Sequence, residues 1–504
     1  MPAMEEEERG RQHFLIVTYP AQGHINPARH LARRLLRATG ARVTVSTAVS
    51  GYRKMFPGAA ADGEGHVDGA GVRYVPYSDG YDGGFDLAAH DHADYMTQVK
   101  LVGSATLAGV LARLRDAGRP VTLVVYTLLL SWVADVARDH GLPAALYWIQ
   151  PAAVLAVYLH FFRGTGGVGR AIKAAGGDPW APIAVPGLPP LKIRDLPSFI
   201  TATSDDDPYA FVLDAFRDLI DKLTCGDEEG DSRPVVLANT FDAMEPEAVA
   251  TLRDHGIDVV PVGPVLSFLD DDAAGGGGGD AAAAEKNSSN DLFEQDGKGY
   301  LEWLDAQAEG SVVYVSFGSL STMSERQIQE IARGMESSGR PFLWVLRRDN
   351  RNSSEVVASL GLGGGGEKKK KEGVGVVVEW CDQVRVLSHR AVGCFVTHCG
   401  WNSTLESVAC GVPVVCAPQW TDQGTNAWIV AERLGTGVRA AVSEKDGVLE
   451  ADELRRCVDF ATSEMVRAKA AVWRNKARAA AAEGGSSERN LRAFVGNLLA
   501  GGDY

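Results

Sequence analysis

The segment that decides the fold runs from Trp380 to Gln423 and reads WCDQVRVLSHRAVGCFVTHCGWNSTLESVACGVPVVCAPQWTDQ. The apolar run GCFVTH at 393–398 predicts a buried strand, and GWNSTLESVACG predicts a helix that ends at Gly411. We expect Asn402 or Ser403 to cap the start of that helix. Strands of this kind alternating with helices indicate a parallel sheet covered on both faces.

The start of this helix has the chemistry of a phosphate site. Free N–H groups at a helix N-terminus suit an anion, and His398, Asn402 and Ser403 add donors beside them. Glu406 lies one turn after Asn402 on the same helix face. A carboxylate there repels phosphate, but it suits two adjacent hydroxyls such as those of a ribose.

Residues at the two ends of the segment complete a predicted nucleotide-sugar site. Trp380 offers a flat face on which a base can stack, and Asp422 and Gln423 suit sugar hydroxyls. Each residue has a structural alternative, because Trp380 could belong to the core, Glu406 to a solvated helix face and His398 to a buried strand. That alternative is weak for all of them together.

The rest of the chain repeats the strand–helix pattern on both sides of a low-complexity stretch at 270–291. We therefore expect an α/β protein with two Rossmann-like domains whose parallel sheets face each other across a cleft. The expected parts are an N-terminal domain at 1–266, a linker at 267–300, a C-terminal domain at 301–485 and a C-terminal helix at 486–504 that packs on the N-terminal domain. The apolar runs that predict strands are 14–19, 42–47, 121–126, 145–149, 235–240, 311–317, 342–347, 374–380, 393–398 and 412–417.

Composition excludes several classes of protein. The chain has 504 residues and a net charge of −15, which argues against nucleic acid and anionic membranes as partners. Its seven cysteines include no CxxC pair and indicate reduced thiols. No signal peptide or membrane anchor is recognisable, and the apolar segment 145–162 favours a buried strand, turn and helix. We expect a cytoplasmic monomer.

A second motif, YPAQGHINP at 19–27, follows the first predicted strand and forms a predicted strand-to-helix loop. It has one glycine, so it is not a dinucleotide fingerprint. Its histidine, His24, could be a satisfied loop residue. Because it follows a strand end next to the expected cleft, it is also a candidate general base.

The 380–423 segment resembles the signature box of plant secondary-product UDP-glycosyltransferases, from its first Trp to its final Asp-Gln. Further similarity lies in YPAQGHINP, in NTFDAMEPEA at 239–248 and in VSFGSLSTMS at 315–324. The resemblance implies a GT-B fold and transfer of glucose from UDP-glucose to a small acceptor, with His24 as base. The residues that it assigns to the donor are Trp380 and Cys381 (uracil), Gln383 and Glu406 (ribose), His398, Asn402, Ser403 and Ser319 (diphosphate), and Trp401, Asp422 and Gln423 (hexose).

The resemblance also implies that no cofactor and no metal are required. A terminal Gln in the box, here Gln423, usually accompanies glucose, whereas His accompanies galactose. The acidic runs at 205–207 and 270–272 resemble a metal-binding DxD motif, but we interpret both as solvated charge.

Two positions depart from the family pattern. The aspartate that usually supports the histidine aligns with Thr127, which can fix an imidazole tautomer but cannot offset its charge. Asp135 is expected to lie too far away, and the loop YSDGYDGGFD at 77–86 is a candidate substitute. A common Thr is replaced by Ile149, and Gln150 is a candidate to take its role.

Weak support for His24 matters least when the acceptor is already acidic. YTLLLSW and WIQP resemble the branch with anthocyanin 5-O-glucosyltransferases and enzymes that esterify indole-3-acetate or crocetin. We therefore expect a phenolic or carboxylic acceptor and a β-glucoside or β-glucose ester as product. The alternatives are a catalytically impaired metabolite-binding protein and the same fold with a different UDP-sugar.

Overall fold

The computed structural model describes residues 12–60, 65–86, 90, 92–201, 211–224, 235–266, 268–269, 299–350 and 375–499. The chain divides into two compact units. Unit 1 comprises Met1–Leu292 and Ala479–Tyr504, and unit 2 comprises Phe293–Arg478. Most of the expected linker at 267–300 lies outside the described residues, as do the acidic runs at 205–207 and 270–272.

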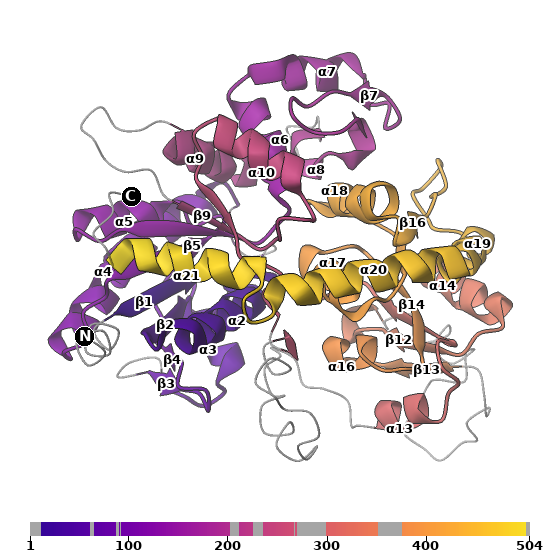
Figure 1. Cartoon of the computed structure of the whole chain (residues 1–504), viewed down its shortest axis with the longest axis horizontal. Helices are drawn as coiled ribbons and strands as arrows, with labels where there is room; N and C mark the ends of the chain where they lie inside the picture. Colours follow the sequence, from indigo (N-terminus) through magenta and orange to yellow (C-terminus); the bar gives the residue numbers. More distant parts are fainter. Residues whose placement is uncertain are drawn as a thin grey trace. The chain divides into compact units, whose positions relative to one another are not determined.

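Unit 1 is built on an eight-stranded sheet in the order β10-β9-β6-β5-β1-β2-β4-β3 (Figure 1). Its strands pair in parallel, except that β3 runs antiparallel to β4. They are β1 (His13–Thr18), β2 (Arg42–Thr47), β3 (His66–Val67), β4 (Arg73–Tyr74), β5 (Leu123–Thr127), β6 (Ala144–Trp148), β9 (Val235–Ala238) and β10 (Val259–Pro261). A separate two-stranded sheet consists of β7 (Pro182–Ile183) and β8 (Leu191–Lys192).

Helices connect the strands of unit 1, as parallel pairing requires. They are α2 (Gln22–Thr39), α3 (Val49–Met55), α4 (His92–Asp116), α5 (Trp132–Asp139), α6 (Ala152–Phe162), α7 (Val168–Ala174), α8 (Ser198–Thr201), α9 (Phe211–Thr224), α10 (Pro246–Asp254) and α21 (Ser486–Leu499). Two 3₁₀ turns, η1 (Thr165–Gly167) and η2 (Ile193–Asp195), complete the unit. Helix α21 packs against α2 and β10, where Asn490 donates a 2.9 Å hydrogen bond to the Pro261 carbonyl.

Unit 2 contains a six-stranded parallel sheet in the order β13-β12-β11-β14-β15-β16 (Figure 1). The strands are β11 (Val312–Ser316), β12 (Phe342–Val345), β13 (Gly375–Val378), β14 (Val392–Thr397), β15 (Val414–Cys416) and β16 (Gly437–Arg439). The helices are α13 (Gly299–Asp305), α14 (Glu325–Ser338), α16 (Gln383–Leu387), α17 (Trp401–Cys410), α18 (Gln423–Trp428), α19 (Ala451–Ala461) and α20 (Glu464–Ala481), with short helical turns η3 (Arg348–Asn350) and η4 (Ile429–Leu434).

Alternation along β11 builds two cores in unit 2. Val313 and Val315 pack with residues of α14 and α19 on one face of the sheet. Val312 and Tyr314 pack with residues of α13 and α16 on the other face. Side chains of a strand alternate between faces, so a strand buried on both sides reads as the continuous apolar run seen in the sequence.

Each sheet reverses its strand order at one place, and this positions the candidate site residues. In unit 1 the reversal lies between β1 and β5, and in unit 2 it lies between β11 and β14. Open α/β sheets bind ligands beyond the carboxyl ends of the strands at such a switch point. His24 follows β1 and Thr127 ends β5, while Ser319 follows β11 and His398 follows β14.

All ten apolar runs form strands, and segment 145–162 forms the expected strand, turn and helix. The short strands, such as β10 and β16, were not predicted from the sequence. Each of these two has three residues, too few to show a periodicity.

Candidate functional site

Helix α17 in unit 2 begins differently from the expectation. Its cap is Gly400, and no side chain caps the helix, so the prediction that Asn402 or Ser403 is the cap was wrong. The preceding residue, Cys399, has a φ of 64°, and after this turn the helix starts at Trp401, two residues earlier than a cap at Asn402 would allow. Asn402 and Ser403 therefore lie in the first turn. The helix ends as expected, with Gly411 in the left-handed conformation.

His398 lies in the turn between β14 and α17, between two glycines. A Cβ on Gly318 or on Gly400 would lie 2.7 Å from the His398 ring, so only glycine allows the backbone this close. The ring is half-buried, and its Nδ1 lies 3.2 Å from Thr397 Oγ1. Burial lowers the pKa of His398 to about 4. Ser319 directly follows Gly318, so the turn after β11 brings it beside this histidine.

Gln383 connects the helix to the strand beneath it. Its Nε2 donates to Ser403 Oγ at 2.8 Å and to Glu406 Oε2 at 2.7 Å. Its Oε1 accepts a 3.2 Å hydrogen bond from the Tyr314 hydroxyl. Both ends of the amide are thus held, and the bond to a carboxylate belongs to the stronger class of hydrogen bonds.

Trp380 and Cys381 follow β13. Trp380 is half-buried and packs against the core cluster that contains Tyr314, whereas Cys381 is buried. The Cys381 sulfur lies 3.5 Å from the Tyr314 hydroxyl. Tyr314 therefore contacts both Cys381, which was predicted to bind uracil, and Gln383, which was predicted to bind the ribose.

Asp422 directly precedes α18 and Gln423 is its first residue, and both side chains are buried. Gln423 Oε1 accepts hydrogen bonds from the backbone N–H groups of Gln419 and Trp420, at 2.8 and 3.2 Å. Asp422 accepts from Thr421 Oγ1 at 2.8 Å and from Asn426 Nδ2 at 2.9 Å. Burial raises the pKa of Asp422.

Asn426 joins this loop to the start of α17, because its Nδ2 also donates to the Cys399 carbonyl at 2.8 Å. The hexose residues predicted at the end of the box are thereby tied to the phosphate residues at its centre. We call the set of predicted donor residues, with Tyr314 and Asn426, the donor group.

The second set of residues lies in unit 1. His24 is not in a loop as predicted, because α2 already begins at Gln22. Pro27 lies inside this helix. Pro27 is the sixth residue of the helix, beyond the first turn, so α2 lacks the backbone hydrogen bond that a residue other than proline would donate there. The motif thus places His24 in the first turn of α2.

Thr127 does occupy the position beside His24. The His24 Nδ1 lies 3.5 Å from Thr127 Oγ1, at the long limit of a hydrogen bond. Thr127 accepts from Tyr19 N at 3.4 Å and donates to Thr18 Oγ1 at 3.5 Å. With the Thr127 proton directed to Thr18, the oxygen can accept from the Nδ1–H tautomer of His24, which leaves Nε2 as the base.

Burial lowers the pKa of His24 to about 4. Among the described residues no carboxylate opposes this shift. Asp135 is held elsewhere, because it forms an ion pair with Lys222 Nζ at 3.0 Å. At pH 7 the His24 imidazole is therefore neutral, and the local environment does not stabilise its protonated form.

The loop at 77–86 is the candidate substitute for the missing aspartate, and it is connected to His24 only through Tyr19 and Tyr95. Its Asp79 is buried, and burial raises the pKa of its carboxyl group. The Tyr19 ring lies 5.3 Å from the His24 ring, and the Tyr19 hydroxyl lies 2.7 Å from that of Tyr95. Asp79 acts electrostatically on Tyr19 and Tyr95. We call His24, Thr127, Tyr19 and Tyr95 the base group.

Ile149 and Gln150 follow β6, next to Thr127 in the sheet. Ile149 is buried, and the side-chain oxygen of Gln150 is buried without a hydrogen-bond partner in the described structure. The loop is fixed by Glu245, whose carboxylate accepts from Ala152 N and Ala153 N at 3.1 and 3.0 Å. Glu245 belongs to the NTFDAMEPEA motif, so that motif supports the loop.

Strained backbone marks both groups. Among the described residues, three non-glycine residues have a positive φ: Leu129 at 73°, Cys399 at 64° and Thr421 at 58°. Each lies within two residues of a predicted site residue. Such strain persists where the surrounding structure fixes it, and it concentrates at functional sites.

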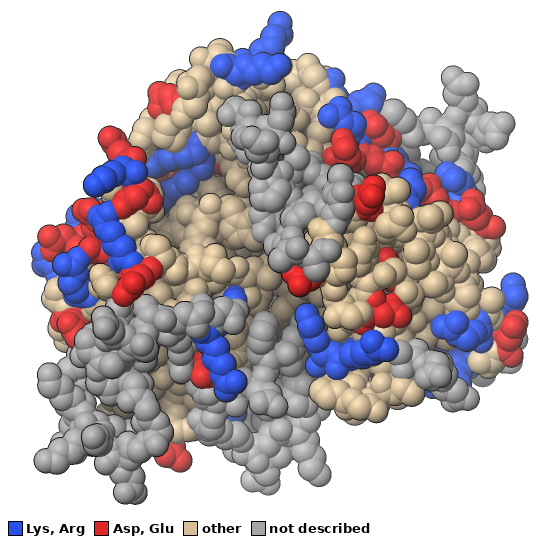
Figure 2. Space-filling view, turned by 180° about the vertical axis from the view of Figure 1, so that it is seen from behind, with Lys and Arg blue, Asp and Glu red and all other residues tan. Residues whose placement is uncertain are grey.

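No group of three or more His, Cys, Asp or Glu side chains that could hold a metal ion occurs among the described residues. Within the same ranges no helix is both long and apolar enough to cross a membrane. On the face shown in Figure 2, basic and acidic side chains of the described residues are interspersed.

Comparison with known proteins identifies the family. Residues 291–453 match the family model of UDP-glucoronosyl and UDP-glucosyl transferases. The crocetin glucosyltransferase of Gardenia jasminoides is 44% identical over 96% of this chain and 97% of its own length. The chain belongs to the UDP-glycosyltransferase family. The phloretin 4'-O-glucosyltransferase of Malus domestica is 41% identical over 96% of this chain and 97% of its own length.

Solved structures of UDP-glycosyltransferases share the fold. Os79 of O. sativa in complex with UDP has a TM-score of 0.77 and 31% identity, covering 96% of this chain and all of that one. UGT2 of Phytolacca americana, complexed with UDP-2fluoro-glucose and pterostilbene, has a TM-score of 0.71 and 25% identity, covering 97% of this chain and 99% of that one. The two Rossmann-like units are thus those of a GT-B glycosyltransferase, an enzyme that takes its sugar from a UDP-sugar donor.

Two residues of the donor group, Tyr314 and Asn426, were not predicted from the sequence of this UDP-glycosyltransferase. Tyr314 lies in β11, far from the box in sequence, although a buried tyrosine needs a partner for its hydroxyl. Asn426 lies four residues after Asp422, and this helical spacing could have indicated their contact.

Proposed function

We propose that this UDP-glycosyltransferase transfers glucose from UDP-glucose to an acidic acceptor oxygen of a small metabolite, a phenol or a carboxylic acid, with inversion at the anomeric carbon. The observation that carries the proposal is the pairing of His24 with Thr127 in place of a carboxylate. The acceptor oxygen attacks the anomeric carbon, the bond from that carbon to the diphosphate oxygen breaks, and UDP leaves. His24 accepts the proton when the acceptor still carries one.

The donor group supplies complementary chemistry for each part of UDP-glucose. Trp380 would stack on uracil, and the Cys381 backbone would meet its edge. Glu406, held by Gln383, would accept from the ribose hydroxyls. In the last part of the box, Asp422 and Gln423 would contact the hexose, with Gln423 offering its NH₂ group because its carbonyl already binds the backbone.

The departing diphosphate would be bound without a metal. The first turn of α17 presents free N–H groups and the positive end of the helix dipole, next to Ser319, His398, Asn402 and Ser403. Trp401, the first residue of that helix, would face the sugar side. Activity that is unchanged by EDTA would support this part of the proposal, and activity restored only by added Mg²⁺ or Mn²⁺ would contradict it.

The acidity of the acceptor follows from the weakness of the base. A base whose pKa is near 4 removes a proton poorly from an aliphatic hydroxyl, which binds its proton about as tightly as water, with a pKa of about 15.7. A phenol, with a pKa of about 10, is easier, and a carboxylic acid, with a pKa of about 4, is already ionised at pH 7. The names of the relatives, crocetin glucosyltransferase and phloretin 4'-O-glucosyltransferase, accord with acceptors of these classes.

Matched acceptors test the proposal directly. Benzoate, 4-methylphenol and benzyl alcohol present the three oxygen types on similar rings, and release of UDP from UDP-glucose measures turnover. We expect kcat/KM for benzyl alcohol to be lower than for either of the others by at least about 100-fold, the low end of the contribution of general base catalysis. Equal or faster turnover of the alcohol would contradict the acidic-acceptor proposal. No UDP release with any acceptor in a broad phenol and carboxylate screen would favour a binding protein.

The donor is tested in the same assay with UDP-glucose, UDP-galactose and UDP-xylose, and faster turnover with either of the last two would overturn UDP-glucose as donor. We also propose a cytoplasmic monomer. The described cysteines are free and all but one are buried, as in proteins of reducing compartments. Fractionation of the native tissue and light scattering after size exclusion check both statements.

A further inference from the structure

Three neighbouring strands of unit 1 each end in a buried threonine. These residues are Thr47 in β2, Thr18 in β1 and Thr127 in β5. Thr18 pairs with Thr47, and it lies beside Thr127 because the residues directly before these two pair across the sheet. Side chains alternate between the faces of a sheet along each strand. The three threonines therefore form one row, on the face where Thr127 contacts His24.

The hydroxyl of Thr127 has three hydrogen-bond partners, and a hydroxyl offers one proton and two lone pairs. The backbone N–H of Tyr19, at 3.4 Å, can only donate, so it occupies one lone pair. The Thr127 proton is directed to Thr18 Oγ1, at 3.5 Å. His24 Nδ1, also at 3.5 Å, is left with the second lone pair. An imidazole nitrogen that meets a lone pair must itself carry the proton of the bond.

Thr18 therefore decides in which direction the bond between Thr127 and His24 runs. Without an acceptor at Thr18, the Thr127 proton would have His24 Nδ1 as its remaining acceptor. A buried donor that lacks a partner is unfavourable, so the bond would reverse. The neutral His24 would then carry its proton on Nε2, the nitrogen that has to be free in order to act as a base.

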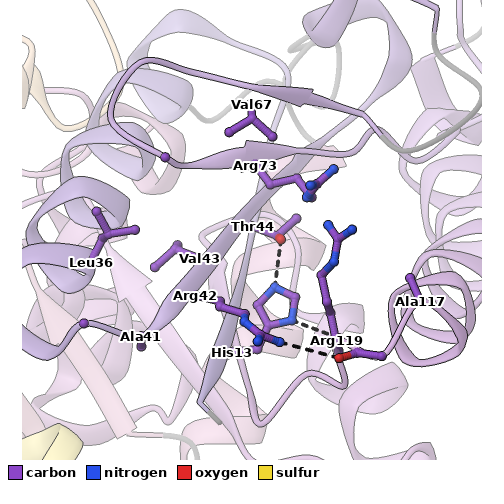
Figure 3. Close-up of a pocket in the computed structure, with 13 residues that line it drawn as sticks. His13, Leu36, Ala41, Arg42, Val43, Thr44, Val67, Arg73, Ala117 and Arg119 are labelled. Carbon is purple, nitrogen blue, oxygen red and sulfur yellow. Dashed lines mark hydrogen bonds between the residues drawn. The ribbon is translucent and has the colours of Figure 1, made fainter. Parts of the chain in front are cut away.

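A histidine–threonine pair at the other end of β1 shows this reversed arrangement (Figure 3). His13 Nδ1 lies 2.9 Å from the Arg119 carbonyl, and its Nε2 lies 2.8 Å from Thr44 Oγ1. Burial lowers the pKa of His13, so its ring is neutral at pH 7. A carbonyl only accepts hydrogen bonds, so Nδ1 carries the proton and Thr44 donates to Nε2. In the described structure Thr44 has no second hydroxyl to take its proton, and the histidine receives it.

We propose that Thr18 is a positioning residue for the candidate base: by accepting the proton of Thr127, it holds His24 in the tautomer whose Nε2 is unprotonated. This role matters to turnover only if His24 is the base, so in that respect it rests on the proposed function. Together the two threonines replace one part of what a carboxylate would do at position 127. They orient the imidazole and fix its tautomer, but they do not offset its positive charge.

The test compares the variants Thr18→Val and Thr47→Val in the full-length enzyme. Each replaces a hydroxyl by a methyl group in the same buried row, but Thr47 Oγ1 has no hydrogen-bond partner in the described structure, so Thr47→Val is the matched control. Histidine-selective ¹⁵N NMR distinguishes protonated from unprotonated ring nitrogens, and the variant His24→Gln assigns the signals of His24. We expect the proton on Nδ1 in the wild type and in Thr47→Val, and mainly on Nε2 in Thr18→Val.

Turnover should follow the tautomer. We expect Thr18→Val to reduce kcat/KM for 4-methylphenol about threefold to tenfold, the effect of a single hydrogen bond. For benzoate, which is already ionised at pH 7, kcat/KM should stay within about twofold of the wild type. Thr18→Ser, which restores the hydroxyl, should return both the tautomer and the phenol turnover toward those of the wild type.

An unchanged His24 tautomer in Thr18→Val, or the same change in Thr47→Val, would overturn the role of Thr18. Equal losses for 4-methylphenol and benzoate would also overturn it, because they would show a general structural effect. If Thr18→Val does not fold, Thr18→Ala takes its place, since alanine lacks the hydroxyl as well. A tautomer that shifts without any loss of phenol turnover would confirm that Thr18 sets the tautomer and contradict His24 as the base, so the two proposals can fail separately.

Discussion

The donor group and the base group occupy equivalent places, each beyond the switch point of its own parallel sheet. They differ in how many short side-chain hydrogen bonds hold their residues. In the donor group, Gln383, Gln423 and Asn426 each make two or more side-chain hydrogen bonds of 3.2 Å or less. In the base group, the described residues give the His24 side chain one hydrogen bond, at 3.5 Å, to the uncharged Thr127.

The difference indicates which of the two substrates, donor or acceptor, is held by the more rigid site. A network of many short hydrogen bonds holds its members in one geometry, which suits a large donor with many contact points. The base group needs only to leave one imidazole nitrogen free. Under the proposed function, the enzyme is preorganised for the sugar nucleotide and permissive toward the acceptor, whose own acidity completes the chemistry.

The largest effect should come from removing the base. We expect His24→Ala to reduce kcat/KM for 4-methylphenol by about 10²- to 10⁴-fold, the usual contribution of general base catalysis. For benzoate, which has no proton to lose at pH 7, the loss should be tenfold or less. The variant His24→Gln keeps a polar side chain but no base, so it controls for shape. Equal losses for both acceptors would mean that His24 positions the acceptor and does not deprotonate it.

The next largest effect should come from breaking the donor network. Gln383→Ala removes a hydrogen bond to the Glu406 carboxylate, and such bonds contribute about 1.5–3 kcal/mol. We expect KM for UDP-glucose to rise roughly 10- to 150-fold on that basis. The matched change in the base group, Thr127→Val, removes only the long contact and should alter kcat/KM less than about fivefold, since the contact is near the geometric limit. Steady-state kinetics on both variants measure the contrast, and comparable losses would refute it.

Giving the base group the carboxylate that it lacks should have a smaller effect. Thr127→Asp places a negative charge beside His24 and should raise the pKa of the imidazole, because an opposite charge favours the protonated form by about 1–3 units. We expect turnover of benzyl alcohol to rise about tenfold, following the stronger base. Thr127→Asn, which has the same size without charge, should show no such gain. If the two variants behave alike, charge support is not what limits the reaction.

The smallest effect concerns stability in acid. Burial lowers the pKa of both His24 and His398 to about 4, whereas an unfolded histidine titrates near 6.5. Between these values each of the two histidines binds more protons in the unfolded chain. Their contribution to stability is therefore full above a pH of about 6.5 and is lost as the pH falls toward about 4. The urea midpoint should therefore be lower at pH 5 than at pH 7.

UDP separates the two histidines in this experiment. A diphosphate beside His398 favours its protonated form, so UDP should reduce the acid-induced loss that His398 causes and leave the loss due to His24 unchanged. The variants His24→Gln and His398→Gln report each contribution. Equal protection by UDP in both variants would show that the titration does not arise at these sites.

The donor group was more predictable from sequence than the base group, for a physical reason. Asn402 and Glu406 lie one turn apart in one helix, so helical spacing places them on the same face. Gln383 belongs to α16, and only the resemblance to the family assigned it to the ribose. Tyr314 supports Gln383 from a strand far away in sequence, and only the pairing of β11 with β14 brings it close.

Backbone geometry was the least predictable part. The motif YPAQGHINP indicated a loop because it lies between an apolar run and a helix-like segment, but α2 already begins at Gln22 and continues through Pro27. The turn at Cys399, which has a positive φ, lets α17 start before the residues that were expected to cap it. Neither glycine nor asparagine occupies that position, so no residue type signalled the turn.

Gln423 has a consequence for changing the sugar that this enzyme uses. Its side-chain carbonyl accepts hydrogen bonds from the backbone of Gln419 and Trp420, so the residue that we propose contacts the hexose also holds the loop that precedes it. Exchanging it for histidine to obtain a galactosyltransferase would alter recognition and scaffold at once. Donor engineering should therefore begin with the loop, giving residues 419–420 another acceptor, and replace the glutamine afterwards.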